Sequence, residues 1–380
     1  MTEAERSLLV RAREFAETVV TPAAAGWDRE RAFGFDALRQ AATLGLTGLQ
    51  VPSELGGLGH SFSCKARLAD ILGGADLGFA MSLINTQNVA YKLARDADPE
   101  VSQRYIPDLL AARRLGSTAL TEPHAGSDFG AITTNATRNA DGWCLNGRKA
   151  WIINTVTSDV LVVYAQTEAG SGGAGIAAFL VDGTRAGFVR ADRFELTSQH
   201  SIGAGGFELV DYQARPNELL QPPGQAFKAA LRDINGARIY VAAMCCGMVE
   251  AALGIAADYG RNRRTFGQRL GEHQGWRWTL GRADVDLAAS RLMVEHAAKL
   301  IDEEKDAQFE AAKAKIFATG MAERHLPALA QLMGAEGLRD CYPFGRHIIG
   351  ARIAGFVDGS TEMLLERLTG RYAKKASGPA

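Results

Sequence analysis

The sequence predicts a mainly α-helical protein with a central antiparallel β-domain. The prediction depends on two changes of hydrophobic period. Apolar residues recur at helical spacing up to about Gly116, alternate as in strands from Ser117 to about Ala214, and return to helical spacing from Gln225. This segregation of helices from strands excludes a doubly wound sheet, and no GxGxxG motif follows a strand. We therefore expect three domains, at residues 1–116, 117–222 and 223–380.

The first domain is expected to consist of helices. Leu8, Leu9, Ala12 and Phe15 lie at three- and four-residue spacing and would form one buried face. Pro22 is expected to end this helix, because proline lacks the N–H that the next turn needs. Further helices are expected at Asp36–Leu44, Ala66–Asp76, Met81–Leu93 and Val101–Ala112.

The middle domain is expected to be all-β, because its apolar runs are short, rich in β-branched and aromatic residues, and separated by Gly and Asn. The expected strands are Trp143–Leu145, Ala150–Ile153, Val160–Ala165, Ile176–Val181, Gly187–Ala191 and Gly206–Asp211. The last domain is expected to be helical as far as Lys375. Its helices are expected at Phe227–Arg261, Gln274–Glu304, Ala307–Ala335 and Thr361–Tyr372.

The charge balance argues against two classes of partner. The 42 Lys and Arg nearly cancel the 43 Asp and Glu, and basic runs do not exceed pairs such as Arg263-Arg264. Neither a nucleic acid nor an anionic membrane surface is therefore expected to bind. The 5 cysteines lack CxxC spacing, which predicts no disulfide framework, no metal site and a reducing cytoplasm. The acidic N-terminus is unlike a signal peptide, and the apolar run Ile239–Val249 is too short to span a bilayer.

Five motifs are distributed along the chain, and together they resemble the flavin-dependent acyl-CoA dehydrogenases over nearly its whole length. The resemblance implies an N-terminal helical domain, a β-barrel-like domain and a C-terminal four-helix bundle. The matching segments are the Gly- and Pro-rich loop Val51–Gly59, the stretch Leu120–Asp128 with Asn146–Asn154 after it, the loop Arg263–Gly267 with His273-Gln274, the segment Gln331–Gly337, and Phe356–Glu362.

The resemblance implies FAD, bound between the β-domain and the bundle of a homotetramer or dimer in which a neighbouring subunit helps to hold it. Trp151 would lie against the flavin ring, and Arg263 would contact the diphosphate across the subunit interface. Two positions depart from the family: Ile153 replaces a common threonine, and Ala335 replaces a glycine. The implied FAD contacts are Leu120, Thr121, Gly126, Ser127, Trp151, Ile153, Arg263, Thr265, Phe266, Gln274, Gln331, Gly334, Ala335, Ser360 and Glu362.

The implied catalytic base is Asp358. In the family a glutamate at this position removes the α-proton of an acyl thioester while the β-hydrogen leaves as hydride to flavin N5, so the aspartate is a departure. Asp358 also precedes Gly-Ser-Thr at a helix start, which is typical of an N-cap, and both roles can hold at once. The alternative base position of some family members, one residue before an arginine, holds Ala237 before Arg238.

The resemblance thus implies α,β-dehydrogenation of an acyl thioester carried by CoA or an acyl-carrier protein, with an electron-transfer flavoprotein as oxidant. Two alternatives stay open: a nitroalkane-oxidase-like flavoprotein, since those enzymes use an aspartate at the matching position, and a flavin-free or inactive structural homologue. The intact Thr121–Asp128 motif favours the dehydrogenase. The implied substrate contacts are Ser127, Asn235, Arg238, Val357 and Gly359.

Overall fold

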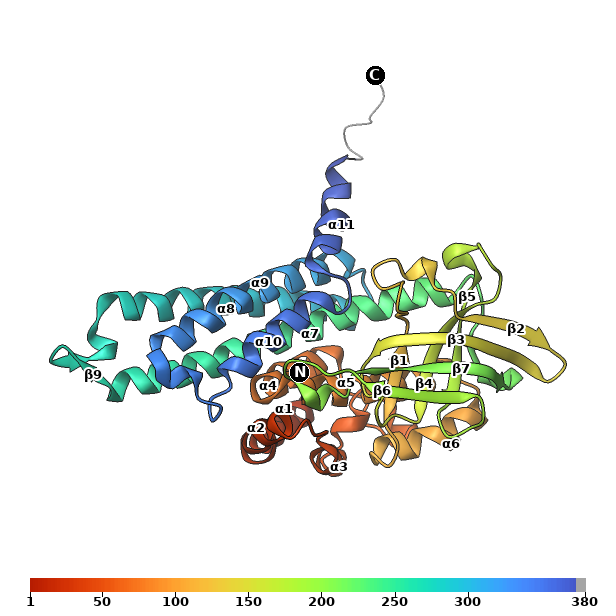
Figure 1. Cartoon of the computed structure of the whole chain (residues 1–380), viewed down its shortest axis with the longest axis horizontal. Coiled ribbons are helices and arrows are strands. Elements are labelled where there is room, and N and C mark those ends of the chain that lie inside the picture. The colour runs from red at the N-terminus through yellow and green to blue at the C-terminus, as the bar shows by residue number, and fades with distance from the viewer. Residues whose placement is uncertain (374–380) are drawn as a thin grey trace, which may run out of the picture.

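The structure is a computed structural model that describes residues 1–373. Helices, a β-sheet and a second set of helices follow one another along the chain (Figure 1), which confirms the predicted fold class. The first set of helices packs on the bundle and on one face of the sheet. Its members are α1 (Glu3–Phe15), α2 (Thr21–Arg29), α3 (Phe35–Thr43), α4 (Phe62–Ala75), α5 (Leu77–Asp96) and α6 (Pro99–Leu110).

Pro22 does not end the first helical segment, so this prediction is wrong. A single π-helical turn at Ala16–Val20 joins α1 to α2, and Pro22 lies in the first turn of α2. The N–H of Thr21 donates to the carbonyl of Ala16, five residues back, which shifts the hydrogen-bond register just before the proline. A proline is tolerated at the start of the next helix because its missing N–H has little to lose there.

The middle region is an eight-stranded sheet in the order β6-β7-β3-β2-β4-β5-β8, with β1 beside β4. Most pairs are antiparallel, as predicted, but β4 pairs in parallel with both β1 and β2. The two strands predicted between Trp143 and Ile153 form one long strand. The strands are β1 (Gly116–Ala119), β2 (Asn135–Asn139), β3 (Gly142–Ile152), β4 (Val160–Gln166), β5 (Ile176–Asp182), β6 (Phe188–Arg193), β7 (Gly205–Ala214) and β8 (Leu219–Gln221).

The second set of helices forms the bundle and ends with α11, which stands out from the body in Figure 1. Helix α10 is not among the predicted helices, since its three glycines lower helix propensity. The predicted continuation to Lys375 lies outside the described residues. The elements are α7 (Ala226–Asn262), the hairpin strands β9 (Arg264–Thr265) and β10 (Gln268–Arg269), α8 (Gln274–Asp302), α9 (Gln308–Leu332), α10 (Phe344–Phe356) and α11 (Thr361–Ala373).

Helix α7 is the central core helix. By length and composition it could cross a membrane, but 72% of its most apolar 18-residue stretch is buried inside the protein. Its 37 residues span about 55 Å at 1.5 Å per residue, from the β-domain to the β9-β10 hairpin (Figure 1). Helix α4 packs closely on it, because a Cβ on Gly247 would lie 1.8 Å from the carbonyl oxygen of Asp70. This close contact fixes the position of α4 on α7.

Candidate active site

Asp358 lies in the turn between α10 and α11, and two buried cations hold its backbone. Nε of Arg238 on α7 donates to the Asp358 carbonyl at 3.0 Å, and Nζ of Lys315 on α9 donates to the Gly359 carbonyl at 2.7 Å. The φ of Asp358 is +56°, a left-handed conformation that aspartate and asparagine tolerate better than most residues. Both cations therefore bind main-chain oxygens. Within residues 1–373 no hydrogen bond or ion pair occupies the Asp358 carboxylate.

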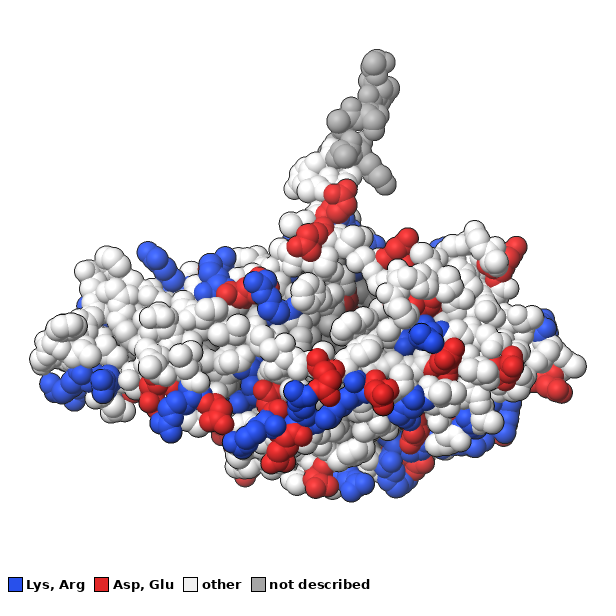
Figure 2. All heavy atoms as spheres, in the orientation of Figure 1, with Lys and Arg blue, Asp and Glu red and all other residues white. Residues whose placement is uncertain are grey.

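The environment of Asp358 suits a proton acceptor. Burial raises the pKa of its carboxyl group above the usual value, and the charges of Lys315 and Arg238 oppose this rise. The residue nevertheless keeps part of its surface exposed. Figure 2 shows the surface hollowed between the base of α11 and the β-domain, where this turn joins α11. A carboxylate with a raised pKa, at a recess and free of internal partners, can take a proton from a bound ligand.

Ser360, and not Asp358, caps α11. Oγ of Ser360 accepts a hydrogen bond from the N–H of Met363 at 3.4 Å, and its carbonyl accepts one from the N–H of Leu364 at 3.0 Å. The predicted N-cap role of Asp358 is therefore wrong, because Asp358 lies two residues before the cap. Its side chain is not needed to satisfy the helix terminus, so the capping role and the proton-accepting role belong to different residues.

Trp151 presents an uncovered aromatic side chain at the end of β3. Its φ is +60°, rare for a bulky residue, and the pairing of β3 with β7 shifts register between Lys149 and Ile152. Such a bulge re-aims a side chain and is typical of functional positions. The Trp151 indole is 59% exposed and contacts the Phe194 ring at 4.4 Å between centroids. A flat apolar surface is thus available to a planar ligand.

A buried ion pair supports the loop that carries the Leu120–Asp128 motif. Nζ of Lys149 donates to Oε1 of Glu122 and to the Leu120 carbonyl, both at 2.9 Å, and the two side chains are 0% and 1% exposed. Glu122 also accepts the main-chain N–H groups of Thr133 and Thr134 at 2.7 and 2.9 Å. Burial opposes ionisation of Glu122, but the Lys149 charge and these hydrogen bonds outweigh it and lower the pKa of Glu122 to about 2. Burial lowers the pKa of Lys149 to about 8, because there the Glu122 charge offsets it only in part.

The remaining motif residues of the β-domain surround this support. Gly126 and Ser127 are exposed, and Leu120 and Thr121 are partly exposed, so a ligand can reach all four. Ile153 instead packs against the main hydrophobic core, and its carbonyl accepts a hydrogen bond from Oγ of Ser117 at 2.7 Å. The core contact explains an apolar side chain at this position.

Seven of the other predicted cofactor contacts lie at the opposite end of the molecule, whereas Ser360 and Glu362 lie at the start of α11, within four residues of Asp358. Arg263, Thr265 and Phe266 belong to the β9-β10 hairpin, at the far end of the bundle from the sheet (Figure 1). Phe266 has a φ of +50° and is 97% exposed. Nε1 of Trp276 donates to the Leu332 carbonyl at 3.4 Å, which ties the start of α8 to the end of α9. The ends of α8 and α9 therefore lie near the hairpin, and with them Gln274, Gln331, Gly334 and Ala335. Within a single chain these residues are far from Trp151.

Four of the five predicted substrate contacts gather at Asp358, whereas Ser127 lies on the exposed loop of the β-domain. Oδ1 of Asn235 accepts a hydrogen bond from Nη1 of Arg238 at 2.8 Å, and Val357 and Gly359 flank Asp358. Sequence reasoning missed the roles of Lys315 and of the Glu122-Lys149 pair. For Lys315 a signal was available, since it is a single charge on a face of α9 that is otherwise rich in buried alanine.

The residues present fit a flavin. A flat ring system needs an aromatic or apolar face and polar groups at its edge, and the β-domain offers both the exposed indole of Trp151 and the exposed Gly126-Ser127 segment. The N–H of Ala150, next to Trp151, donates to the carbonyl of Thr121 on the same loop at 3.1 Å. Thr121 and Leu120 lie on the same supported loop, with surface left uncovered. These five residues, Trp151 and the four of the loop, would hold the ring end of FAD, and the hairpin arginine would suit a phosphate.

Comparison with known proteins identifies the family: the chain belongs to the acyl-CoA dehydrogenases. Three family descriptions match it, namely the N-terminal domain over residues 2–113, the middle domain over residues 117–211 and the C-terminal domain over residues 224–372. The predicted family is confirmed, and with it the class of FAD-dependent oxidoreductases that act on CH–CH bonds.

Individual relatives match over nearly the full chain. The short-chain specific acyl-CoA dehydrogenase of Homo sapiens mitochondria is 31% identical over 96% of this chain and 88% of its own length. The structure of butyryl-CoA dehydrogenase from Megasphaera elsdenii is 28% identical and covers 98% of this chain and 99% of its own, with a TM-score of 0.94. A solved structure described with the electron transferring flavoprotein of Acidaminococcus fermentans is 28% identical to this chain. It covers 98% of this chain and 98% of its own, with a TM-score of 0.93.

Proposed function

We propose that this protein oxidises an acyl thioester to the α,β-unsaturated product, with Asp358 as the base that removes the α-proton. The observation that supports this most directly is the free carboxylate of Asp358, which burial makes more basic while main-chain hydrogen bonds fix its position. When bound, FAD supplies the acceptor for the hydride that leaves the β-carbon. Trp151, Thr121 and Ser127 would orient the ring and exclude water on the β-domain side.

The electron acceptor of the reduced enzyme is proposed to be an electron-transfer flavoprotein, which the relative from Acidaminococcus fermentans supports. The protein is proposed to work in the cytoplasm, where its 5 unpaired cysteines stay reduced. The carrier of the acyl group is CoA or an acyl-carrier protein.

An anaerobic titration tests the proposed function. Purified protein is expected to show flavin absorbance at about one FAD per chain, and that absorbance should bleach when a suitable acyl thioester is added. Parallel samples receive nitroalkanes in air while oxygen consumption is followed. Bleaching by thioesters without rapid oxygen uptake supports a dehydrogenase, whereas oxygen uptake with nitroalkanes and no response to any thioester supports the oxidase alternative. A folded protein that takes up no FAD would contradict both.

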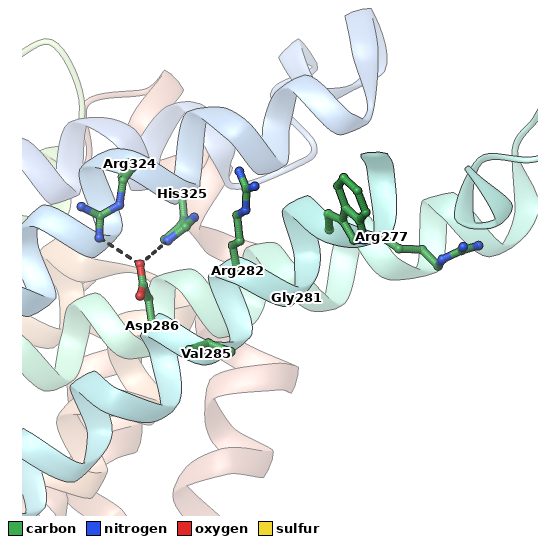
Figure 3. Close-up of a pocket in the computed structure, with 8 residues that line it drawn as sticks. Arg277, Gly281, Arg282, Val285, Asp286, Arg324 and His325 are labelled. Carbon is green, nitrogen blue, oxygen red and sulfur yellow. Dashed lines mark hydrogen bonds and ion pairs between the residues drawn. The ribbon is translucent and has the colours of Figure 1, made fainter. Parts of the chain in front are cut away.

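We propose that a second copy of the chain completes the cofactor site, because the two groups of predicted FAD contacts lie at opposite ends of one chain. Helix α8 has an exposed apolar stripe at seven-residue spacing, formed by Trp278, Val285 and Leu292, and such a stripe suits a packed helix of another copy. Trp278 and Val285 line a surface pocket in which Arg324 and His325 of α9 point to Asp286 of α8 (Figure 3). This α8 surface, together with the hairpin, is the proposed subunit contact.

Replacing Arg263 with alanine is expected to lower FAD retention and oligomer stability together. Arg263 is exposed and has no carboxylate partner within residues 1–373, so its removal should cost little in the folding of a single chain. Loss of an arginine-phosphate contact should weaken FAD binding by about ten- to a hundredfold. Gel filtration at several protein concentrations and the flavin-to-protein absorbance ratio measure the two effects. Arg261→Ala, which removes an exposed arginine two residues earlier in the last turn of α7, is the control.

A further inference from the structure

Lys65 of α4 differs from the other buried lysines of the described residues. Lys92 and Lys149 form ion pairs with carboxylates. Lys315 donates to the backbone carbonyls of Gly355 and Gly359, on either side of Asp358. Lys65 is only 2% exposed, yet within residues 1–373 no carboxylate lies within ion-pair distance of its ammonium group. A buried cation without a counter-charge is costly, so proteins rarely keep one without a function.

The polar groups around Lys65 come from three other segments. Nζ of Lys65 donates to Oδ1 of Asn88 on α5 at 2.6 Å and to Oε1 of Gln50 at 3.1 Å, and it lies 5.6 Å from the centroid of the Tyr240 ring. Nδ2 of Asn88 in turn donates to the Tyr240 hydroxyl at 3.0 Å. These contacts form one connected cluster of Lys65, Gln50, Asn88 and Tyr240.

This cluster has two hydrogen-bond donors to spare. An ammonium group has three N–H donors, and Lys65 uses two of them. The Tyr240 hydroxyl accepts from Asn88, and its own hydrogen has no acceptor within residues 1–373. One positive charge and two free donors are the requirements of a bound carboxylate.

The cluster lies within electrostatic range of the Asp358 turn. Tyr240 follows Arg238, which holds that turn, by two residues on α7, and the Asp358 charge adds to the effect of burial in raising the pKa of Tyr240. Asn88 and Gln50 are only partly buried, so the cluster is not sealed inside the core. A substrate whose α-carbon lies at Asp358 could therefore extend its acyl group toward Lys65.

We propose that Lys65, with Tyr240, binds a carboxylate at the far end of the acyl group, so that the preferred substrate is the monothioester of a dicarboxylic acid. The inference rests on the proposed function of the Asp358 site. Burial lowers the pKa of Lys65 to about 7, against the opposing effect of Asp233, and a bound carboxylate would favour its charged form.

The experiment compares succinyl-CoA and glutaryl-CoA with butyryl-CoA and valeryl-CoA on the FAD-loaded protein. Binding is measured by calorimetry under anaerobic conditions, and flavin bleaching is followed in parallel. The wild type is expected to bind a carboxylated thioester at least about tenfold more tightly than the neutral thioester of similar length. Lys65→Met, which keeps the length of the side chain, should abolish this preference and change the affinity for neutral thioesters less than about threefold. Lys313→Met, on the exposed surface of α9, is the matched control and should retain the preference.

A wild type that prefers neutral thioesters, or a Lys65→Met variant that keeps the preference, would overturn the inference while leaving the proposed function intact. Failure of every thioester to bind or to bleach the flavin would instead overturn the proposed function. Should Lys65→Met not fold, Tyr240→Phe removes only one free donor. It is expected to weaken binding of the carboxylated thioester about three- to tenfold without affecting the neutral one, and an equal effect on both would count against the proposal.

Discussion

Replacing Asp358 with asparagine is expected to slow flavin reduction by an acyl thioester by about three decades or more, because the variant has no base to accept the α-proton. FAD content and thermal stability should not fall. Arg238 and Lys315 bind backbone carbonyls of this turn, Ser360 caps the helix, and asparagine tolerates the φ of +56°. Anaerobic stopped-flow spectroscopy measures the rate, and a thermal melt measures the stability. A near-normal rate in the variant would show that another group takes the proton.

The pH profile gives a second test of Asp358. Its pKa is raised by burial, so the ionised base should be lost, and kcat/KM should fall, as the pH decreases through a value above the usual range of an aspartate. Asp358→Asn should lack this acidic limb. Asp358→Glu places a carboxylate one methylene further out and is expected to keep partial activity, with preference shifted toward ordinary straight-chain acyl-CoA.

Replacing Glu122 with glutamine is expected to have the largest effect on stability, about 3–5 kcal/mol, because it leaves the fully buried ammonium of Lys149 without its partner. The Leu120–Asp128 loop should loosen at the same time, so FAD should be retained less well. Chemical denaturation and the flavin-to-protein ratio measure the two effects. The double variant Glu122→Gln, Lys149→Met removes the unpaired charge and should recover much of the lost stability. If the single variant were as stable as the wild type, the pair would not be what holds this loop.

The stability that the Glu122-Lys149 ion pair contributes should depend on pH in the acid range. The pKa of Glu122 is about 2 in the folded state against 4.5 for the free side chain, so the folded state binds the proton less well. The stability from this group is therefore complete above pH 4.5 and is lost as the pH falls toward 2. Glu122→Gln should lack this contribution to the pH dependence between these two values.

The fold could be predicted largely from the hydrophobic period, because long amphipathic helices and buried strands such as β4 and β5 leave a strong signal. The signal fails where packing or local geometry overrides it. Strand β2 is mostly exposed and polar, and α10 is rich in glycine, so neither has a clear period. Pro22 follows a π-helical turn that no sequence rule indicates.

The candidate site was predictable where a motif names its residues, and not where the fold brings distant groups together. Asp358 follows from its motif, but its freedom from capping depends on Ser360 and on two cations from α7 and α9. In the sequence, Glu122 is typical of a turn. Only the fold shows that it forms a buried ion pair with Lys149, which lies 27 residues later in the chain. The Lys65 cluster combines α4, α5, α7 and the loop that holds Gln50, a combination that only the packing determines.

The position of the β9-β10 hairpin at the far end of α7 from Trp151 has a genetic consequence. In the proposed assembly each catalytic centre combines the Asp358 of one subunit with the Arg263 of another. A subunit carrying Asp358→Asn and a subunit carrying Arg263→Ala are then each defective alone, but a mixed assembly contains centres in which both wild-type residues meet. Two alleles with inactive products would therefore complement each other when expressed in one cell.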